Sequence, residues 1–532
     1  MTQRSSQVGS GGALWPLSSD GRPVARVVAP NIERTGQFDG VWPIDDPATG
    51  QVVGWCDPTS LDEVDSVVDM ALHAFPAWAA LAPTDRSAAM VAGAALIEDH
   101  LAELAACLVK EVGKTGDESL GDVRGGISLL RSFAALASRA AEVHDLSGLE
   151  STGAADEVLV HRVPVGPVVV ITPWNSPIYL TMNCVAPALA AGCTVVVKPA
   201  EAAPLGVTAA LELLSSALPA GVLTVVQGAG AEVGSALCAH NEIRGVLFVG
   251  GTAAGRKVLH AAAPTIKKVS LELGGNDPAI VLDDAVLNDG ALRELVAGCY
   301  SLSGQVCFNI KRIYVHRSRF AELLDGFTRL VDQIVVGPGD DPTVQMGPLT
   351  TVAGYTNARR LLDELAQSGA EVHEGGVFST GSAHPAGRFI RPTVVTGLDR
   401  THELVVTEQF APIIPIIPFD TDDDAVYEAN RTEYGLCSSV WSSDPDHARS
   451  VALRIQAGNT FINAHRIGAS VPLVPFGGFK QSGQGRNHMM HAIAECTEEH
   501  AIVRYSRPGD QIPGIQSWLS LNLSSIAGPV TG

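Results

Sequence analysis

Between Val165 and Val281, short apolar runs alternate with segments of helix length. The runs GPVVVIT, TVVVK, GVLTVV, GVLFV and KKVSLE are the length of strands. Continuous apolar strands separated by helices are typical of a parallel sheet that is covered on both faces. Such sheets bind ligands at the carboxyl ends of their strands. The alternation therefore predicts a doubly wound α/β fold and directs attention to the residues that follow each strand.

The pattern changes on either side of this segment. Residues 41–57 are predicted to form two short strands around a Pro-Ala-Thr-Gly turn, and residues 60–142 have helical spacing. From about Asp284 to Pro475, strands and helices alternate a second time. A chain of 532 residues is long enough for two or three domains, each with its own core. We therefore expect two α/β domains, the first with a Rossmann-like doubly wound parallel sheet.

The composition argues against several classes of function. A formal net charge of −21 is unsuited to binding nucleic-acid phosphates, and no basic cluster is visible. The first residues lack the apolar core of a signal peptide, and no apolar run reaches transmembrane length. The nine cysteines are scattered without a C-x-x-C pair, so neither a disulfide framework nor a zinc site is indicated. We expect a cytoplasmic protein with no nucleic-acid or membrane partner.

Polar side chains follow the first two strands. GPVVVIT is followed by Pro-Trp-Asn, which places Asn175 at the start of a helix. Asn175 is suited either to capping that helix or to donating an amide N–H to a developing oxyanion. TVVVK ends in Lys198 and is followed by Pro-Ala-Glu, so Lys198 and Glu201 are either solvated charges or a pair that faces a ribose. A carboxylate here would repel a 2′-phosphate, so Glu201 favours NAD over NADP.

Glycines follow two later strands. GVLFV is followed by Gly250, Gly251 and Gly255, whose helix could present backbone N–H groups to a pyrophosphate. This motif is weak because the G-x-G-x-x-G spacing is absent, and the glycine-rich residues 228–234 are expected to form a plain turn. KKVSLE ends at Glu272, before Leu-Gly-Gly. Partial burial would raise the pKa of Glu272 toward the range of a general base, and a solvated surface carboxylate is the alternative.

Cys307 follows a Ser-Gly-Gln-Val segment in the second α/β pattern. A free cysteine is usually a small core residue. The nearest basic residues, Lys311 and Arg312, are four and five positions away. The neighbours of Cys307 therefore do not separate a core thiol from a nucleophile.

Taken together, the motifs resemble the aldehyde dehydrogenase superfamily, in its NAD-dependent hydrolytic type. In chain order they are PWN, KPAE, GGTAAG, LELGG, GQVC, EQFAPIIP and PFGGFKQSGQGR, and the resemblance covers roughly residues 38–505. It implies that the Cys307 thiolate attacks an aldehyde while Asn175 and the Cys307 backbone N–H hold the oxyanion. It also implies that NAD is reduced, and that Glu272 then activates water to hydrolyse the thioester to a carboxylic acid.

The resemblance further implies a set of residues that bind NAD, with NADP less favoured. Lys198 and Glu201 would hold the adenosine ribose, and Glu408 would hold the nicotinamide ribose with Phe410 beside it. The full expected cofactor set is Thr172, Pro173, Trp174, Lys198, Glu201, Gly250, Gly251, Gly255, Leu273, Glu408 and Phe410. No metal ligands are expected.

The resemblance also divides the chain into parts. These are a flexible tail (1–28), an NAD-binding domain (29–150 and 166–273), a catalytic domain (274–486), a small β oligomerisation arm (151–165 and 487–508) and a second tail (509–532). An apolar, alternating edge strand needs to be covered, so a homodimer or homotetramer is expected. Lys268 and Glu498 occupy positions where a basic–acidic pair commonly steadies that interface.

Some positions depart from the family pattern. Many members have a lysine and a glutamate behind the general base that relay a proton, and by spacing those positions are Cys184 and Asn487 here. We therefore expect a slower or pH-shifted hydrolysis step. The entrance positions Ser176, Asn183 and Ser301 are polar rather than aromatic, which predicts a wider and more polar mouth. No arginine is convincingly placed to hold a substrate carboxylate, so an acidic semialdehyde is not favoured.

Two alternatives to the hydrolytic enzyme remain open. A CoA-acylating relative would use CoA in place of water, but such members usually lack the glutamate that is present here as Glu272. A catalytically silent family fold acting as a binding protein would have lost the nucleophile or the base. Both are present in this sequence, as Cys307 and Glu272.

Overall fold

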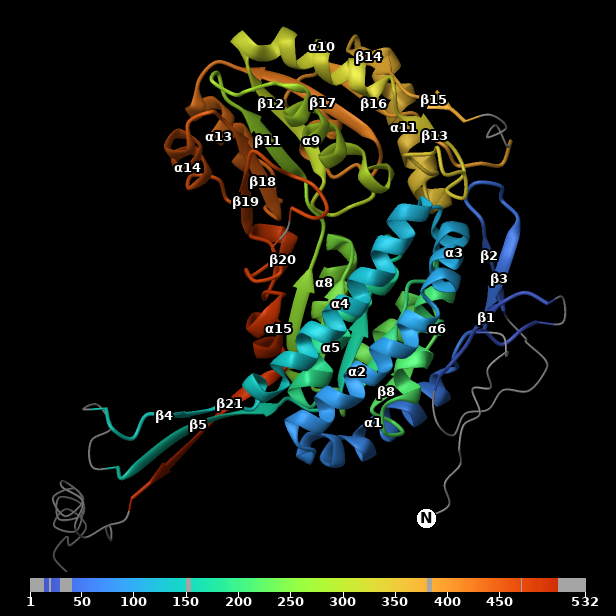
Figure 1. Cartoon of the computed structure of the whole chain (residues 1–532), viewed down its shortest axis with the longest axis vertical. Helices are drawn as coiled ribbons and strands as arrows, with labels where there is room; N and C mark the ends of the chain where they lie inside the picture. Colours follow the sequence, from blue (N-terminus) through green and yellow to red (C-terminus); the bar gives the residue numbers. More distant parts are fainter. Residues whose placement is uncertain are drawn as a thin grey trace, which may run out of the picture.

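The computed structural model describes residues 14–18, 21–28, 41–149, 155–379, 385–469 and 471–505. It contains two large sheets with helices around them, one above the other in Figure 1, and a narrow three-stranded sheet that extends from the lower part. Both large sheets are mainly parallel, so the α/β class predicted from the alternation is confirmed. None of the described helices is long and apolar enough to cross a lipid bilayer.

The lower sheet has six strands in the order β20-β10-β9-β6-β7-β8. The five predicted runs form its parallel strands, which are β6 (Val168–Ile171), β7 (Val195–Lys198), β8 (Leu223–Val225), β9 (Gly245–Val249) and β10 (Lys268–Glu272). Successive side chains of a strand point to opposite faces. Val168 and Val170 accordingly pack into one core, and Val169 and Ile171 into another. Burial of both faces explains the uninterrupted apolar runs.

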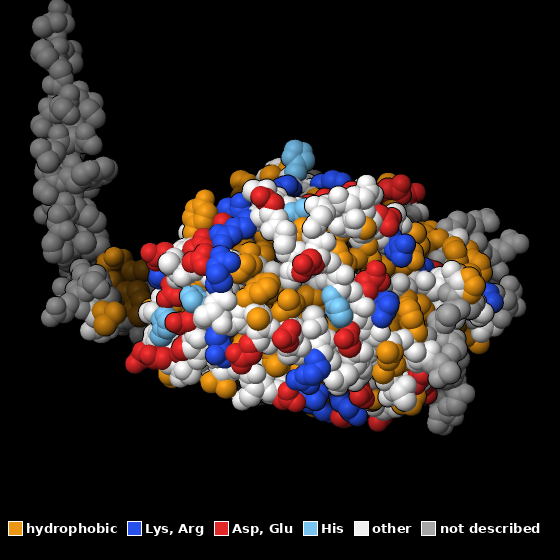
Figure 2. All heavy atoms as spheres, turned by 90° about the horizontal axis from the view of Figure 1, so that it is seen from above, with side chains coloured by type: hydrophobic (Ala, Val, Ile, Leu, Met, Phe, Trp, Pro, Cys, Tyr) orange, Lys and Arg blue, Asp and Glu red, His pale blue; other side chains and the backbone are white. Residues whose placement is uncertain are grey.

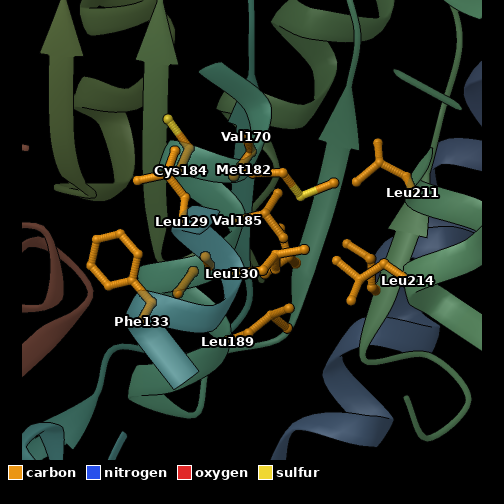
Figure 3. Packing of buried hydrophobic residues seen from close by; sticks show 14 of the residues in the cluster. Leu129, Leu130, Phe133, Val170, Met182, Cys184, Val185, Leu189, Leu211 and Leu214 are labelled. Atoms are coloured by element: carbon orange, nitrogen blue, oxygen red, sulfur yellow. The ribbon is translucent and has the colours of Figure 1, made fainter. Parts of the chain in front are cut away.

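Helices cover both faces of this sheet. They are α1 (Leu61–Ala80), α2 (Pro83–Asp99), α3 (Leu101–Val112), α4 (Gly116–Ala140), α5 (Pro177–Ala191), α6 (Leu205–Ser216), α7 (Ser235–Ala239) and α8 (Thr252–Ala262). On one face, Leu130 of α4, Met182 of α5 and Leu214 of α6 belong to one core (Figure 3). Helices α1, α7 and α8 pack on the opposite face. The sheet is therefore enclosed, and only the ends of its strands are open to a ligand.

The upper sheet has seven strands in the order β14-β16-β17-β12-β11-β18-β19. Their bounds are β11 (Asp277–Val281), β12 (Ile310–His316), β14 (Glu371–Glu374), β16 (Thr393–Thr396), β17 (Ile413–Phe419), β18 (Cys437–Trp441) and β19 (Asn459–Ile462). Only β14, at one edge, is antiparallel to its neighbour. The helices are α9 (Asp289–Tyr300), α10 (Phe320–Val331), α11 (Val352–Ser368), α12 (Glu403–Val406), α13 (Asp422–Asn430) and α14 (Pro445–Ala452).

The beginning of the chain adds a small sheet. The hairpin predicted over residues 41–57 is confirmed as β2 (Trp42–Asp45) and β3 (Val52–Cys56), which pair in antiparallel fashion. β1 (Val24–Ala25) pairs with β3, and the Trp15 indole N–H donates to the Leu205 carbonyl at 3.1 Å. Residues 14–18 and 21–28 therefore lie against the body, which corrects the flexible tail expected through residue 28. The second expected tail, residues 509–532, lies outside the described residues.

The narrow sheet, which we call the arm, consists of β4 (Val143–Asp145), β5 (Glu157–Pro164) and β21 (Thr497–Arg504). β5 lies in the middle and pairs with both neighbours in antiparallel fashion. Lys268 Nζ lies 3.8 Å from a Glu498 oxygen, and Lys268 also donates to the Thr497 carbonyl at 2.6 Å. This contact joins the arm to β10 within one chain.

Three expected boundaries differ in the structure. β4 belongs to the arm although it precedes residue 151, and α15 (Met489–Glu495), expected in the arm, packs against α4 and α5. β20 (Gly483–Gln484), expected in the catalytic domain, extends the lower sheet by pairing with β10. Residues 228–234 contain a π-helix at Gly230–Gly234 that runs into α7 rather than a plain turn. These elements are too short to leave a periodic pattern in the sequence.

Candidate active site

The predicted site residues meet where the two large sheets face each other. The carboxyl ends of β6, β9 and β10 supply one side, and the segment before β12 supplies Cys307. They enclose a pocket of about 200 Å³, lined by Pro173, Trp174, Asn175, Leu180, Val249, Gly250, Gly251, Glu272, Leu273, Gly274, Cys307, Glu408 and Phe410. The predicted cofactor residues outside this lining are Thr172, Lys198, Glu201 and Gly255. Leu180, Val249 and Gly274 were not predicted.

Cys307 is half-buried and follows a tight turn. Leu302 and Ser303 in that turn have φ values of 52° and 57°, in the left-handed region that most side chains avoid. Burial raises the pKa of the Cys307 thiol, and the carboxylates of Glu408 and Glu272 raise it further. In the free protein the thiol is therefore protonated near neutral pH. A base or a bound ligand must favour its ionisation before it can attack.

Asn175 does not cap the helix that follows it. The N-cap residue of α5 is Ser176, without a side-chain capping bond, so the capping alternative is wrong. The buried Asn175 amide instead donates one N–H to the Gln305 carbonyl at 2.9 Å, two residues before Cys307. The amide nitrogen has a second N–H, and Asn175 lines the same pocket as Cys307. The arrangement can supply a donor to an oxyanion formed at the thiol.

Glu272 is buried at the end of β10, so the alternative of a surface carboxylate is wrong. Neither of its carboxylate oxygens has a hydrogen-bond partner among the described residues. A Cβ added to Gly477 would lie 2.8 Å from one of these oxygens, so glycine leaves the room that the carboxylate occupies. Burial raises the pKa of Glu272 well above its ordinary value, while Arg486 lowers it and Glu495 raises it. Such a group is suited to proton transfer.

The two expected relay positions are occupied by groups without charge. Cys184 is buried, and burial raises the pKa of its thiol to about 12, with the Glu272 carboxylate adding to the effect. Asn487 exchanges backbone hydrogen bonds with Phe476, at 3.1 and 2.7 Å. Cys184 is therefore a neutral thiol beside Glu272. The expected change in the hydrolysis step stays a prediction.

Glu408 and two aromatic rings lie on the other side of the pocket. Glu408 accepts the Gly275 backbone N–H at 3.2 Å, and burial raises the pKa of Glu408 to about 7. The rings of Trp174 and Phe410 meet edge to face, with 5.7 Å between their centroids. A carboxylate beside two aromatic rings could accept a ribose hydroxyl and border the nicotinamide ring attached to that ribose.

Lys198 and Glu201 lie beside the glycine-rich segment before α7. The buried Lys198 ammonium donates to the Pro199 carbonyl at 2.8 Å and lies 3.9 Å from Glu201. Burial lowers the pKa of Lys198. The half-exposed Glu201 carboxylate accepts the Gly230 N–H at 2.5 Å. An exposed carboxylate next to a buried cation could accept ribose hydroxyls, as the sequence predicted.

The glycines before α8 have different surroundings. Gly251 precedes the first turn of α8 without a side-chain cap, and a Cβ added to it would meet nothing within 4 Å. The first N–H groups of that helix are therefore approachable by an anion. A Cβ on Gly255 would lie 2.6 Å from Leu273, so this glycine allows close packing. The hydroxyl of Thr172 is paired with that of Thr181 at 2.7 Å.

A buried ion pair under the site was not predicted. Lys114 Nζ lies 2.5 Å from an Asp122 oxygen and donates to the Ser176 hydroxyl at 3.2 Å. The other Asp122 oxygen accepts the Tyr179 N–H at 2.6 Å. The pair therefore fixes the first turn of α5, directly after Asn175. The sequence contains no direct sign of this pair, because single charged residues usually lie on a solvated face. The one related signal is the capping box that begins α4.

The three polar side chains that were expected to line the entrance are at most partly exposed. The Ser176 hydroxyl accepts from Lys114, the Ser301 hydroxyl donates to the Ala297 carbonyl at 2.6 Å, and Asn183 is buried. Ser301 lines a separate pocket of about 320 Å³ that also contains Arg293. A wide, polar entrance stays a prediction.

The sequence and the fold of this chain are similar to those of known proteins. A family model described as the aldehyde dehydrogenase family matches residues 37–502. A mitochondrial succinate-semialdehyde dehydrogenase of Oryza sativa subsp. japonica is 34% identical over 490 residues, which are 90% of this chain and 91% of the relative. A probable NADP⁺ succinate-semialdehyde dehydrogenase of Sinorhizobium fredii is 35% identical over 84% of this chain and 90% of the relative. The crystal structure of Staphylococcus aureus betaine aldehyde dehydrogenase with NAD⁺ has a TM-score of 0.85 and 29% identity, over 91% of this chain and 95% of that one.

Proposed function

Because this chain belongs to the aldehyde dehydrogenase family, we propose that it oxidises an aldehyde to the acid through a thioester on Cys307. The protein is an oxidoreductase that acts on aldehydes with NAD or NADP. The observation that carries the proposal is the single pocket that holds Cys307, Glu272 and Asn175 together. Asn175 and Glu272 were singled out at separate strand ends, and the role of Cys307 was implied by the family resemblance.

In the first half of the proposed reaction, Cys307 gives its proton to water, and its sulfur attacks the aldehyde carbon. The oxyanion of the resulting thiohemiacetal is held by the Asn175 amide and the Cys307 backbone N–H. NAD, when bound, accepts a hydride from the substrate carbon. Trp174, Phe410 and Glu408 would hold its nicotinamide end, and the open N-terminus of α8 would receive its phosphates.

In the second half, Cys307 carries the acyl group as a thioester. Glu272 takes a proton from water, and the water oxygen attacks the thioester carbon. The carbon–sulfur bond breaks, and the carboxylic acid leaves. Burial of Glu272 supports this role, because a carboxyl with a raised pKa is a stronger base once it has ionised.

NAD is the proposed cofactor, with NADP less favoured. The supporting observation is the half-exposed Glu201 carboxylate, which would repel the extra phosphate of NADP. In Glu201→Ala we expect kcat/KM with NADP to rise relative to NAD, because that repulsion is removed. Wild-type protein that already prefers NADP would contradict the assignment.

We also place the enzyme in the cytoplasm, as a homodimer or homotetramer. All nine cysteines are present as free thiols, which supports a reducing compartment. The exposed arm supports assembly, since its outer strand β21 is exposed along nearly its whole length. Cell fractionation with a tagged chain tests the location, and recovery with an organelle would contradict it.

A panel of aldehydes tests the proposed reaction. It includes succinate semialdehyde and betaine aldehyde, on which relatives are named, together with aromatic and long aliphatic aldehydes. We expect NADH formation without CoA from at least one of them, and none from Cys307→Ala. Formation that requires CoA would favour a CoA-acylating enzyme. Turnover that survives Cys307→Ala would exclude the thioester, and no turnover with any aldehyde would favour a binding protein.

A further inference from the structure

Lys311 is a fully buried lysine at the beginning of β12, four residues after Cys307. Its ammonium donates to the carbonyl of Gly304, in the turn that precedes Cys307. The same ammonium lies 5.0 Å from the centre of the Phe410 ring. Lys311 therefore contacts both the loop that carries Cys307 and the Phe410 ring, which is proposed to border the nicotinamide.

Acidic groups surround this cation on several elements. Glu408, Asp277 at the start of β11, the Cys307 thiol and the Cys299 thiol of α9 all interact with Lys311. Burial lowers the pKa of Lys311, and Glu408 and Asp277 oppose that effect. A buried ammonium is costly unless charges and acceptors compensate it. Its position at the site is therefore not explained by packing alone.

The neighbouring Asp277 leads to the other end of the same loop. Asp277 lies 3.7 Å from His465, whose Nε2 is 2.8 Å from the carbonyl oxygen of Phe308, directly after Cys307. The segment between Gly304 and Phe308 is thus held at both ends by buried side chains. Of these two side chains, Lys311 and His465, Lys311 also contacts Phe410 in the proposed cofactor site.

We propose that Lys311 is a positioning residue whose buried ammonium holds the Cys307 loop and the Phe410 ring together and brings a positive charge to the site. The proposal rests on the proposed function, in which Cys307 is the nucleophile and Glu408 faces the cofactor. One cation then links the binding of the cofactor to the reactivity of the thiol.

The charge has a definite sign of effect. A positive charge favours the ionised forms of nearby acids, and Lys311 lowers the pKa of both Cys307 and Glu408. Removing the charge raises both values. At a fixed pH near 8, less Cys307 is then thiolate and less Glu408 is carboxylate.

Two measurements that need no aldehyde test this proposal. The first is the rate at which iodoacetamide alkylates Cys307 as a function of pH, with Cys307→Ala defining the background from the other cysteines. The second is the NADH dissociation constant as a function of pH. The variants are Lys311→Met, Lys311→Gln, which can still donate a hydrogen bond, and Lys311→Arg, which keeps the charge. Lys267→Met is the matched control, because Lys267 donates to the His240 carbonyl at 2.7 Å away from the site.

We expect Lys311→Met and Lys311→Gln to slow alkylation at pH 8 on the order of tenfold, because a higher thiol pKa leaves less thiolate at a fixed pH. Both variants also move the NADH binding curve to higher pH. Lys311→Arg restores most of each effect, and Lys267→Met changes neither.

The proposal would be overturned if Lys311→Met and Lys311→Gln differed from the wild type only in a lower melting temperature. In that case their pH dependences of alkylation and of NADH binding would match those of the wild type. If neither variant folds, the double variant Lys311→Met with Glu408→Gln, which removes both buried charges together, is compared with Glu408→Gln alone. Slower alkylation of Cys307 in the double variant is expected, because only Lys311 differs between the two, and equal rates overturn the link. Because both readouts omit the aldehyde, they remain valid even if Cys307→Ala retains turnover and the proposed reaction fails.

Discussion

At the scale of single residues, the site holds acids whose pKa values are raised by burial. Lys311 partly opposes this effect at Cys307 and Glu408, and Arg486 opposes it at Glu272. Several acids and cations in a small volume couple their protonation. The activity of the site is therefore expected to depend on pH in more than one step.

Replacement of the general base separates the two halves of the reaction. In Glu272→Gln the first turnover is expected to remain as a burst of NADH, because the thiohemiacetal forms without Glu272. Steady-state turnover falls about 10²- to 10⁴-fold, the usual contribution of general base catalysis. Stopped-flow absorbance of NADH measures both phases. Equal loss of the burst and the steady rate would argue that Glu272 acts before hydrolysis.

The pH dependence of hydrolysis follows from the sign of the Glu272 shift. A carboxyl whose pKa is raised by burial is neutral below that value, and its base form grows as pH rises. Wild-type steady-state turnover is therefore expected to increase from pH 6 toward alkaline pH, and Glu272→Gln to lose this increase. A wild-type profile that is flat between pH 6 and pH 9 would contradict the role.

Cofactor binding has its own pH dependence. Burial raises the pKa of Glu408 to about 7, so its ribose-accepting carboxylate is lost as pH falls below that value. NADH is expected to bind more weakly at pH 6 than at pH 8. Glu408→Gln should show weaker binding with little change across this range, and isothermal titration calorimetry measures both. If Glu408→Gln shows the same change in NADH affinity between pH 6 and pH 8 as the wild type, a group on NADH and not Glu408 is titrating, and the prediction is contradicted.

The residue roles could be predicted in part from the sequence. Asn175 and Glu272 follow apolar strands of a parallel sheet, and strand ends of such a sheet converge, so their meeting was predictable. Lys311 and Asp122 were not singled out, because a buried charged residue and a solvated one look alike in a sequence. Burial depends on packing partners that lie far along the chain.

At the scale of elements, α4 supports the site through its first turns. Its capping-box residue Glu118 accepts the Leu302 N–H at 2.8 Å, in the turn before Cys307. Asp122, one turn later, pairs with Lys114 and holds the start of α5. One helix end therefore positions both the nucleophile loop and the helix that follows Asn175.

The buried pair is expected to matter more than an exposed one. Lys114→Met leaves the Asp122 carboxylate unpaired in the interior, which costs about 3 to 5 kcal/mol of unfolding free energy. Arg329→Met, which removes an exposed pair with Asp289 at 2.7 Å, is the control and should cost about 0 to 1 kcal/mol. Urea denaturation measures both. Equal effects would show that the pair contributes no more than a surface contact.

Long elements were predictable and short ones were not. The parallel strands of the lower sheet left uninterrupted apolar runs because both of their faces are buried. β20 is two residues long and pairs only with the edge of β10, so no period identifies it. For this reason β20 was expected in the catalytic domain, although it belongs to the lower sheet.

At the scale of the whole molecule, the arm carries exposed apolar side chains on its outer strand β21. Ile502, Val503 and Tyr505 are each more than two-fifths exposed on or next to β21. On the face shown in Figure 2, basic and acidic side chains of the described residues are interspersed, and neither sign of charge forms a large patch there. The arm is therefore the surface on which we expect a second copy of the chain to pack.

Two charges on β21 should weaken that assembly. Ile502→Asp with Val503→Lys is expected to shift the homodimer or homotetramer toward monomer, because burying either charge in an apolar contact is costly. Sedimentation velocity over a range of concentrations measures the shift. Leu453→Asp, at an exposed leucine on the upper half, is the control. An unchanged sedimentation coefficient would place the interface elsewhere.

The protonated state of Cys307 has a consequence for survival under oxidants. Peroxide converts a cysteine to sulfenic acid by reacting with the thiolate, so a buried thiol with a raised pKa reacts slowly. The same burial that delays ionisation of Cys307 is therefore expected to slow its oxidation between catalytic cycles. We expect little irreversible loss of the enzyme to peroxide while it waits for substrate.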